Sequence, residues 1–550
     1  MGTTHEVLNQ PPNLVNYDLA GADPVLGAGV RGEGASWALD EIEAFGRRMA
    51  SAEVIDWGFQ VERNPPQLHT HDRYGNRVDR VEFHPAWHSL LDLALSHGLH
   101  SLPWEKAPGE GGYPARAALT FLASQIEAGH WCPVSMACSA IPTLRLQPEI
   151  AREWEPIQLS RDYDQSFQPA SKKTGVMIGM GMTEKQGGSD VRSNTTVAEP
   201  IDGGGPGGEY LITGHKWFLS SPMSDAFLVL AQAPGGLSCF LLPRFTPDGE
   251  LNAIQLQRLK DKLGNRSNAS AETEFEGAWA RLVGEEGRGV AVIIEMVAGT
   301  RLDCIAGSAA LMRQAVTQAV HHARHREAFG AKLIDKPLMR NVLADLEIET
   351  EAAVLLMTRV AGAFDRSTFD EHESAVKRIL TPVAKYWVTK RCSEVVREAM
   401  ECLGGNGYVE ESMMPRLYRE SPVNAIWEGS GNVIALDVIR VLAREPDALA
   451  ALRREVEGVR GHDPTLDAAI TAAFADLEGP DQPEEGARSL VEGLALATAG
   501  ALLARHARPE VFTAFAAGRL GRAGGNLYGT LPSGTDFAAV IEPAIPYMLG

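Results

Sequence analysis

The spacing of apolar residues changes along this chain of 550 residues, and each change limits what that stretch can fold into. From about Ser36 to Ser171, apolar residues recur at helical spacing, as in Ala115 to Gly129. Between Gly175 and about Val283 the period changes to that of β-strands, in short apolar runs such as Phe227 to Ala231 that are bounded by glycine and proline. The sequence therefore predicts a helical segment followed by a compact β segment.

Long helices are predicted again after the β segment. Val290 to Phe329 and Leu338 to Asp365 are apolar on one stripe and charged on the other, and facing stripes on consecutive helices imply a bundle. A last Ala-rich stretch from Pro446 is also helical. The predicted class is α+β, with an N-terminal helical domain, a middle β-barrel or sheet, a helical bundle and an extra helical C-terminal domain. The expected domain boundaries are residues 1–174, 175–285, 286–445 and 446–550.

Composition excludes several classes of protein. Lys plus Arg number 51 and Asp plus Glu 71, and a net charge of −20 argues against a surface that tracks nucleic acid or anionic membrane throughout. The first residues lack the basic and apolar regions of a secretory signal, and the longest apolar run, Gly493 to Ala504, is too short to span a bilayer. Six cysteines form no CxxC pair, which indicates a reducing compartment, the cytoplasm. We expect no membrane association.

The first motif that indicates chemistry is Gly181-Met-Thr-Glu-Lys-Gln-Gly-Gly-Ser-Asp190. Its glycines allow a ligand to approach backbone N–H groups closely, and the hydroxyls of Thr183 and Ser189 both donate and accept hydrogen bonds. This combination suits a polar heterocycle or a phosphate. A tight turn without a ligand is the alternative.

The second motif is Glu401-Cys-Leu-Gly-Gly-Asn-Gly-Tyr408, which Glu411, Arg416 and Glu420 follow. Glycines after a helical stretch end a helix and allow close approach of a neighbour. Taken alone, this motif favours a helix terminator.

The third motif is Ile426-Trp-Glu-Gly-Ser-Gly-Asn432. A carboxylate in an apolar stretch is costly unless it is paired or poised for proton transfer, so Glu428 is a candidate general base. An ion pair with Arg416 or Arg419 is the alternative. The histidines 321, 322 and 325 lack the carboxylate or cysteine partners of a metal site, and we expect no metal.

Together, in this order and spacing, the three motifs resemble the acyl-CoA dehydrogenase family of flavoproteins. The first is similar to its signature G-[apolar]-T-E-x-x-G-G-S-D, and the second fits E-x-x-G-G-x-G-Y-x-x-E-x4-R-x3-E at every specified position. Gly214-His-Lys-Trp-Phe-Leu-Ser220 and His325-Arg-Glu-Ala-Phe-Gly330 are similar to two further family segments. The resemblance extends to the AidB-like adaptive-response branch, whose members carry an extra C-terminal domain. It implies an N-terminal α-domain, a β-domain and a four-helix bundle.

The resemblance also implies bound FAD. Residues on two segments would contact the flavin ring and its phosphate side, and residues near the second and third motifs would complete the nucleotide site, with Arg326 and Phe329 reaching a neighbouring subunit's FAD. The implied cofactor-binding residues are Met182, Thr183, Gly188, Ser189, Phe218, Ser220, Arg326, Phe329, Gly405, Trp427, Ser430 and Asn432. Because two chains would build each site, a homotetramer arranged as a dimer of dimers is implied.

Glu428 corresponds to the family's usual catalytic base, which removes the proton next to the thioester carbonyl while the flavin takes hydride from the next carbon. Some family members carry the base at the position of Thr300, which cannot serve. Ala298 stands where the family often has an Asp that holds the CoA chain, so we expect weak or narrow activity on a short or branched acyl-CoA. Electron-transfer flavoprotein is a candidate partner.

A second hypothesis is a flavoprotein that binds double-stranded DNA and protects it from, or destroys, alkylating agents, as is thought of the AidB-like branch. Residues 448–550 hold 8 Arg, no Lys and 13 Asp plus Glu, a poor composition for a duplex binder. The candidate nucleic-acid contacts are Arg440, Arg505, Arg508, Arg519 and Arg522. An ordinary solvated helical face is the alternative. A third hypothesis is oxidation of a small nitro or amine compound on the same fold.

Overall fold

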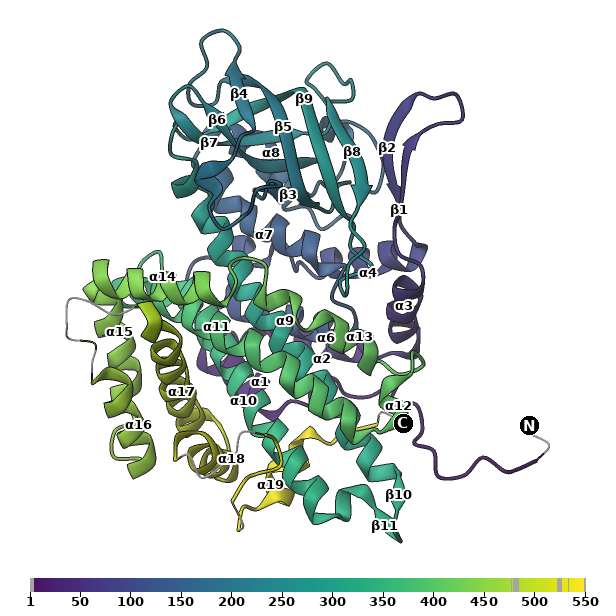
Figure 1. The fold of residues 1–550 in the computed structure, drawn as a ribbon, viewed down its shortest axis with the longest axis vertical. Coiled ribbons are helices and arrows are strands. Elements are labelled where there is room, and N and C mark those ends of the chain that lie inside the picture. The colour runs from purple at the N-terminus through teal and green to yellow at the C-terminus, as the bar shows by residue number, and fades with distance from the viewer. Residues whose placement is uncertain (1–3, 476, 478–483, 522–526, 533, 549–550) are drawn as a thin grey trace. The chain divides into compact units, whose positions relative to one another are not determined.

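A computed structural model gives the structure of the chain, and it describes residues 4–475, 477, 484–521, 527–532 and 534–548 (Figure 1). Contacts group the chain into two compact units. The first comprises residues 1–55, 106–126 and 301–550, and the second comprises residues 56–105 and 127–300. Each unit is built from several stretches of sequence, and helix α9 (Gly289–His325) contributes residues to both.

The second unit contains a seven-stranded sheet in the order β3-β6-β4-β5-β9-β7, with β8 paired to β9. A further pairing of β6 with β7 closes the ring, so the sheet forms a barrel. Its strands are β3 (Ile178–Gly181), β4 (Val197–Pro200), β5 (Glu209–Ser220), β6 (Ala226–Ala233), β7 (Gly236–Pro243), β8 (Ile254–Leu259) and β9 (Ser270–Val283). Alternate residues on neighbouring strands, among them Phe227, Val229, Phe240 and Leu242, fill the core, which confirms the predicted spacing of two.

Helices of the second unit are α4 (Pro85–Ser96), α5 (Leu102–Glu105), α7 (Trp131–Arg145) and α8 (Pro148–Gln158), and α3 (Ala52–Arg63) enters it. A hairpin of β1 (Gln67–His71) and β2 (Arg77–Glu82) interrupts the stretch for which the sequence predicts mostly helices. Its turn is fixed locally, because Asp72 accepts hydrogen bonds from the backbone of Tyr74 and Asn76, and Gly75 takes a φ of 86°.

The first unit is helical. It contains α1 (Pro24–Gly32), α2 (Leu39–Met49), α6 (Gly112–Ile126), most of α9, α10 (Pro337–Arg366), α11 (Glu371–Cys402), α12 (Gly405–Tyr408), α13 (Met414–Glu420) and α14 (Gly431–Arg444). The two long helices predicted from the apolar stripes are present as α9 and α10. The expected first helix ends at His325 rather than Phe329, because the chain turns there into a hairpin of β10 (Glu327–Ala328) and β11 (Ala331–Lys332).

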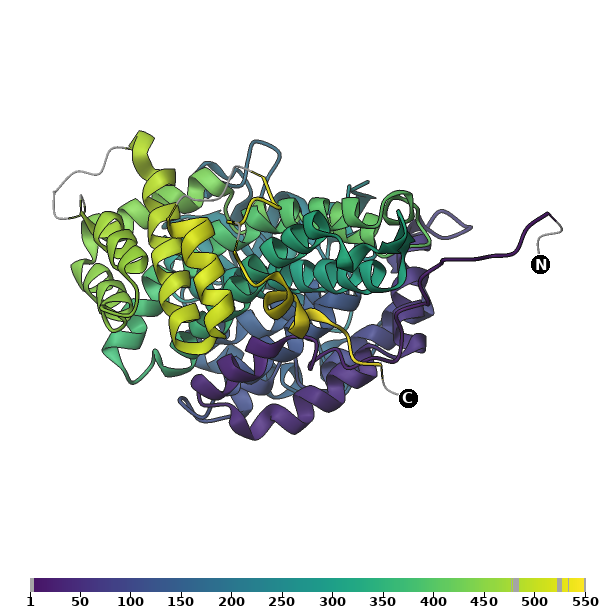
Figure 2. The ribbon, with the colours of Figure 1, turned by 90° about the horizontal axis from the view of Figure 1, so that it is seen from below.

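The appended C-terminal helices belong to the same unit and pack on α10 and α11 (Figure 2). They are α15 (Pro446–Glu457), α16 (Pro464–Phe474), α17 (Ala487–His506), α18 (Pro509–Phe515) and α19 (Phe537–Ile541). Among the described residues, Glu484–His506 is long and apolar enough to cross a membrane, but most of its apolar stretch is buried inside the protein, as in a core helix. The predicted α+β class is confirmed, whereas the four domain boundaries stay a prediction.

Candidate active site

The first motif forms a loop that follows β3 and is fixed from behind by Glu184. The carboxylate of this residue is fully buried and accepts hydrogen bonds from Lys216 Nζ at 2.8 Å and from the backbone of Thr195 at 2.7 Å. Burial alone would raise the pKa of Glu184, but the hydrogen bond from Lys216 holds it well below its usual range. The charged pair therefore anchors the loop to the barrel.

The outer face of this loop presents the residues predicted to contact a flavin. Met182 and Thr183 are half-buried, and Gly188 and Ser189 are exposed. A side chain at position 188 would lie 2.3 Å from the Thr183 hydroxyl, so any residue other than glycine would displace the Thr183 side chain. Backbone and hydroxyl groups thus remain open to a ligand on this face.

Strand β5 brings the second predicted segment to the same loop. The backbone of Trp217 donates a hydrogen bond to the carbonyl of Thr183 at 2.8 Å. Beyond it Phe218 is 48% exposed, and Ser220 Oγ lies 3.1 Å from Ser270 Oγ. A ledge of polar groups next to an exposed aromatic ring fits a flat heterocycle with mixed donors and acceptors, such as the flavin ring.

The third motif forms a strained loop in the first unit. Glu428 takes a φ of 57°, a left-handed conformation that costs about 1–2 kcal/mol for a residue other than glycine. Two cations hold the loop in this shape through its backbone. Arg301 donates to the carbonyl of Glu428 at 3.0 Å, and Lys385 donates to the carbonyls of Trp427 at 3.0 Å and Gly429 at 2.6 Å.

The two cations are themselves fixed. Arg301 forms an ion pair with Asp437 at 2.7 Å. Lys385 is 1% exposed, and burial lowers the pKa of its ammonium group. The sequence alternative paired Glu428 with Arg416 or Arg419, but Arg416 donates to the carbonyl of Ile126 and Arg419 pairs with Glu410. Each guanidinium group therefore has at least one partner other than Glu428, and the ion pair with Glu428 stays an alternative prediction.

Helix α14 begins directly after this loop and carries Ser430 and Asn432 at its start. The side-chain oxygen of Asn432 accepts a hydrogen bond at 2.8 Å from Arg488, a residue of the appended helix α17. A pocket of about 480 Å³ is lined by both predicted residues together with Arg488 and Lys390. Sequence reasoning missed these two cations and Lys385, since nothing local in the sequence links them to the third motif.

The residues predicted to reach a neighbouring subunit lie at the surface of the first unit. Phe329 is 96% exposed and takes a φ of 51° between β10 and β11. Arg326 donates to the carbonyl of Asn9 at 2.5 Å, and Gly405 is exposed at the start of α12. An exposed phenyl ring is unfavourable in water, and it is removed from water only if another surface covers it.

The arginines proposed to contact DNA are engaged within the protein. Arg519 forms ion pairs with Asp345 at 2.7 Å and Glu349 at 2.8 Å, and Arg505 lies 3.7 Å from Glu455. Arg508 donates to backbone carbonyls of α19, and Arg440 keeps a side chain that is 58% exposed. Arg522 lies outside the described residues. In the described part of the chain, no group of three metal-ligating side chains gathers.

Comparison with known proteins defines the family. Models of the acyl-CoA dehydrogenase middle domain and C-terminal domain match residues 179–278 and 287–443, and a model of the adaptive response protein AidB N-terminal domain matches residues 9–165. The chain is 46% identical over 523 residues to the putative acyl-CoA dehydrogenase AidB of Escherichia coli, covering 95% of both chains. It is 32% identical to acyl-CoA dehydrogenase family member 11 of Caenorhabditis elegans, covering 85% of this chain and 80% of the relative.

Solved structures agree. The crystal structure of Caenorhabditis elegans ACDH-11 in complex with C11-CoA is similar over 94% of both chains, with a TM-score of 0.85 and 28% identity. The chain belongs to the acyl-CoA dehydrogenase family and is an oxidoreductase of that type. Within this family it is AidB-like, because it carries the AidB N-terminal domain and is similar to the Escherichia coli protein along nearly its whole length.

The buried pair of Glu184 and Lys216 behind the loop of residues 181–190 leads to a stability prediction. Glu184→Gln and Lys216→Met should each lower the free energy of unfolding by about 3–5 kcal/mol. The first variant leaves the buried charge of Lys216 without its partner, and the second leaves that of Glu184 without its partner. The double variant should cost less than the sum of the two single losses, and urea unfolding followed by tryptophan fluorescence measures all three.

A matched control is the pair of Arg258 and Glu272, which lie 2.7 Å apart in the same barrel, with the Arg258 side chain 67% exposed. Arg258→Met should change stability by about 1 kcal/mol or less. Strictly additive losses at positions 184 and 216 would show that the two charges are not coupled.

Proposed function

We propose that the protein catalyses FAD-dependent α,β-dehydrogenation of a short or branched acyl-CoA, with Glu428 as the base. The observation that carries this proposal is the Glu428 loop, whose strained backbone is held by hydrogen bonds from Arg301 and Lys385. A protein keeps such strain where the position of a side chain matters. Family membership supplies the class of reaction.

In this proposal the Glu428 carboxylate removes the proton from the carbon next to the thioester carbonyl. Arg301 and Lys385 bind the backbone carbonyls of Glu428 and Gly429, which fixes the backbone position of the Glu428 side chain. A base held in a fixed position can meet that proton with less loss of entropy. Bound FAD would supply the oxidant that accepts the β-hydrogen as hydride. Thr300 takes no part as a base, since its hydroxyl donates to the carbonyls of Met296 and Val297 in its own helix.

Residues of two separate segments would bind the cofactor. Thr183, Ser189 and Ser220 offer hydroxyl groups, and Phe218 offers an exposed ring, on two segments joined by the Trp217–Thr183 hydrogen bond, which supports binding of the flavin ring there. Ser430 and Asn432 would take the nucleotide end, where Lys390 and Arg488 add positive charge for phosphate oxygens. Ala298 still predicts a low rate, because it offers no carboxylate to the CoA chain.

We also propose a homotetramer in which Arg326, Phe329 and Gly405 serve a neighbour's cofactor, and an electron-transfer flavoprotein as electron acceptor. The exposed Phe329 supports the oligomer, since a covered phenyl ring is worth about 1.5–3 kcal/mol. All six cysteines are buried thiols, which supports a cytoplasmic location.

Replacement of the base tests the proposed chemistry. Glu428→Gln keeps the shape of the side chain but cannot accept a proton, so we expect dehydrogenation to fall by about 10²–10⁴-fold. The measurement is anaerobic bleaching of bound flavin by isovaleryl-CoA and by straight-chain acyl-CoAs. Flavin content should be unchanged, and a Glu428→Gln protein that bleaches at the wild-type rate would exclude this base.

Replacement of the exposed phenylalanine tests the oligomer. Phe329→Ser should lower both the flavin-to-protein absorbance ratio and the fraction of tetramer seen by analytical ultracentrifugation, because two chains are proposed to share each cofactor. Phe369→Ser is the matched control, as Phe369 is also 61% exposed in the first unit. Equal behaviour of the two variants would contradict a role for Phe329 at an interface.

The second candidate function is a DNA-associated flavoprotein that protects against alkylating agents. Similarity to the AidB-type chain favours it, but Arg505, Arg508 and Arg519 contact groups within the protein, which leaves them less able to neutralise phosphates. Under this hypothesis Arg440 is the most accessible of the described candidates.

Fluorescence anisotropy with a labelled duplex tests this candidate. DNA binding through phosphate contacts should be present at low salt, weaken steeply as salt rises, and decrease in Arg440→Glu. Absence of binding to wild-type protein at low salt would remove the DNA hypothesis.

A further inference from the structure

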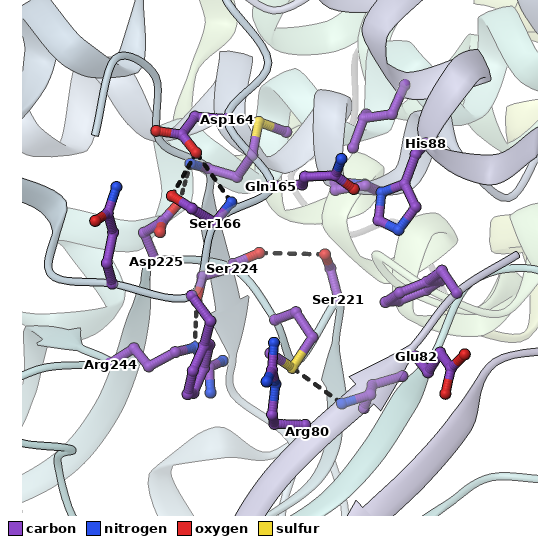
Figure 3. A pocket seen from close by; sticks show the side chains of 18 of the residues that line it. Arg80, Glu82, His88, Asp164, Gln165, Ser166, Ser221, Ser224, Asp225 and Arg244 are labelled. Carbon is purple, nitrogen blue, oxygen red and sulfur yellow. Dashed lines mark hydrogen bonds between the residues drawn. The ribbon is translucent and has the colours of Figure 1, made fainter. Parts of the chain in front are cut away.

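A pocket of about 590 Å³ lies within the second unit (Figure 3). Its walls come from the β1–β2 hairpin, helix α4, residues 163–168 and the neighbouring ends of β6 and β7. Such a volume is typical of a pocket for a small organic molecule. None of the predicted flavin-site residues lines it, so it needs an explanation of its own.

Aromatic rings form much of the wall. Phe83 and Trp87 stack with their ring centroids 4.0 Å apart, and His88 and Tyr163 stack at 5.8 Å. The Tyr163 hydroxyl also lies 2.6 Å from His88 Nδ1, which fixes both rings. Flat, rigid aromatic walls favour a ligand with a flat apolar body.

Two arginines of this pocket lie near the same aromatic ring, that of Phe167. The guanidinium carbon of Arg80 lies 5.0 Å from the ring centroid of Phe167, and that of Arg244 lies 5.9 Å from it. Arg80 is exposed, whereas Arg244 is 4% exposed and burial lowers the pKa of its guanidinium to about 10. The pocket thus has one cation at its rim and one in its depth.

The buried arginine has an unused donor. Its Nε donates to the carbonyl of Ser224 at 3.0 Å, but within the described part of the chain its Nη2 has no hydrogen-bond partner. The indole N–H of Trp87, which is 5% exposed, likewise has none there. Leaving a buried donor unpaired is unfavourable, so a ligand with acceptor atoms would recover that cost.

The carboxylates near the pocket are already satisfied. Asp225 pairs with Lys173 at 2.7 Å and accepts a hydrogen bond from the backbone of Met177. Asp164 accepts hydrogen bonds from Ser166 and Thr174, and the Glu82 side chain is 75% exposed and pairs with His69. These carboxylates therefore have partners of their own, whereas Arg244 Nη2 and Trp87 Nε1 have no hydrogen-bond partner in the described part of the chain.

We propose that this pocket binds a small organic anion with a flat aromatic body, an aromatic carboxylate. The oxyanion would accept hydrogen bonds from Arg244 and Trp87 and face the charge of Arg80, while the body would lie against Phe83 and Phe167. A phosphate ester of the same body offers the same acceptor chemistry, so the probes below separate the two sources.

Calorimetric titration of the full-length, flavin-loaded protein with 1-naphthoate, 1-naphthyl phosphate, inorganic phosphate and the neutral 1-naphthamide tests the proposal. We expect 1-naphthoate to bind at least about tenfold more tightly than the amide, because only the acid carries a charge for the arginines. If 1-naphthyl phosphate binds more tightly than 1-naphthoate, the oxyanion site is supported and its ligand is a phosphate ester. Inorganic phosphate alone should bind weakly, since it has no body for the aromatic wall.

Variants locate the site. Arg80→Gln and Trp87→Phe should each weaken 1-naphthoate binding by about threefold to thirtyfold, and Arg80→Gln should leave amide binding unchanged. Arg244→Met should weaken 1-naphthoate binding more. If this variant does not fold, Arg80→Gln and Trp87→Phe still test the site. Arg73→Gln, at the tip of the same hairpin and outside the pocket, is the matched control and should bind normally.

Equal affinity for acid and amide would overturn the proposal. So would wild-type affinity in both Arg80→Gln and Trp87→Phe, or no binding of either anionic probe at millimolar concentration. None of these results bears on dehydrogenation, because the Glu428→Gln experiment tests that separately.

Discussion

The candidate chemistry of the first unit depends on the contact of Lys385 with the backbone of the Glu428 loop. One ammonium group bridges the carbonyls of Trp427 and Gly429, and Arg301 takes the carbonyl between them. Three consecutive carbonyls therefore point at two cations, and this arrangement stabilises the left-handed turn of Glu428. These contacts involve backbone carbonyls and not the Glu428 carboxylate. They fix the backbone from which the carboxylate extends.

The second unit uses the same device at its own loop. Lys216 reaches through the barrel to Glu184 and to the carbonyl of Leu230, and the loop that bears Thr183 and Ser189 is held as a result. In both units a buried lysine ties an irregular loop to regular structure. Irregular backbone is where binding groups are placed, and rigid elements beneath it supply the precision.

Much of the fold could be predicted from the sequence, because burial repeats with the period of each element. The short apolar run Phe227 to Ala231 corresponds to β6, and the apolar stripe from Leu338 to Asp365 corresponds to α10. The β1–β2 hairpin was wrongly included in a helical stretch, because its strands are largely polar and its turn depends on Asp72. Because β1 and β2 contain few apolar residues, their sequence gives little indication that they pair as strands.

The candidate site was only partly predictable for a different reason. Glycines, hydroxyls and Glu428 stand in compact motifs, so their chemistry is visible in the sequence. Lys385 and Arg488 act on residues 42 and 56 positions away, and Arg244 and Trp87 meet only in the folded pocket. Such partners become visible only when the chain is folded.

The most direct test of the account is hydrogen exchange at the reacting carbon. Wild-type protein and Lys385→Met, each loaded with FAD, are incubated anaerobically with butyryl-CoA in D₂O, and loss of the α-proton signal is followed by NMR. We expect exchange in the wild type and at least about tenfold slower exchange in Lys385→Met at equal flavin content, since a loss of about 1.4 kcal/mol in positioning has that effect. Equal exchange rates in the two proteins would contradict it.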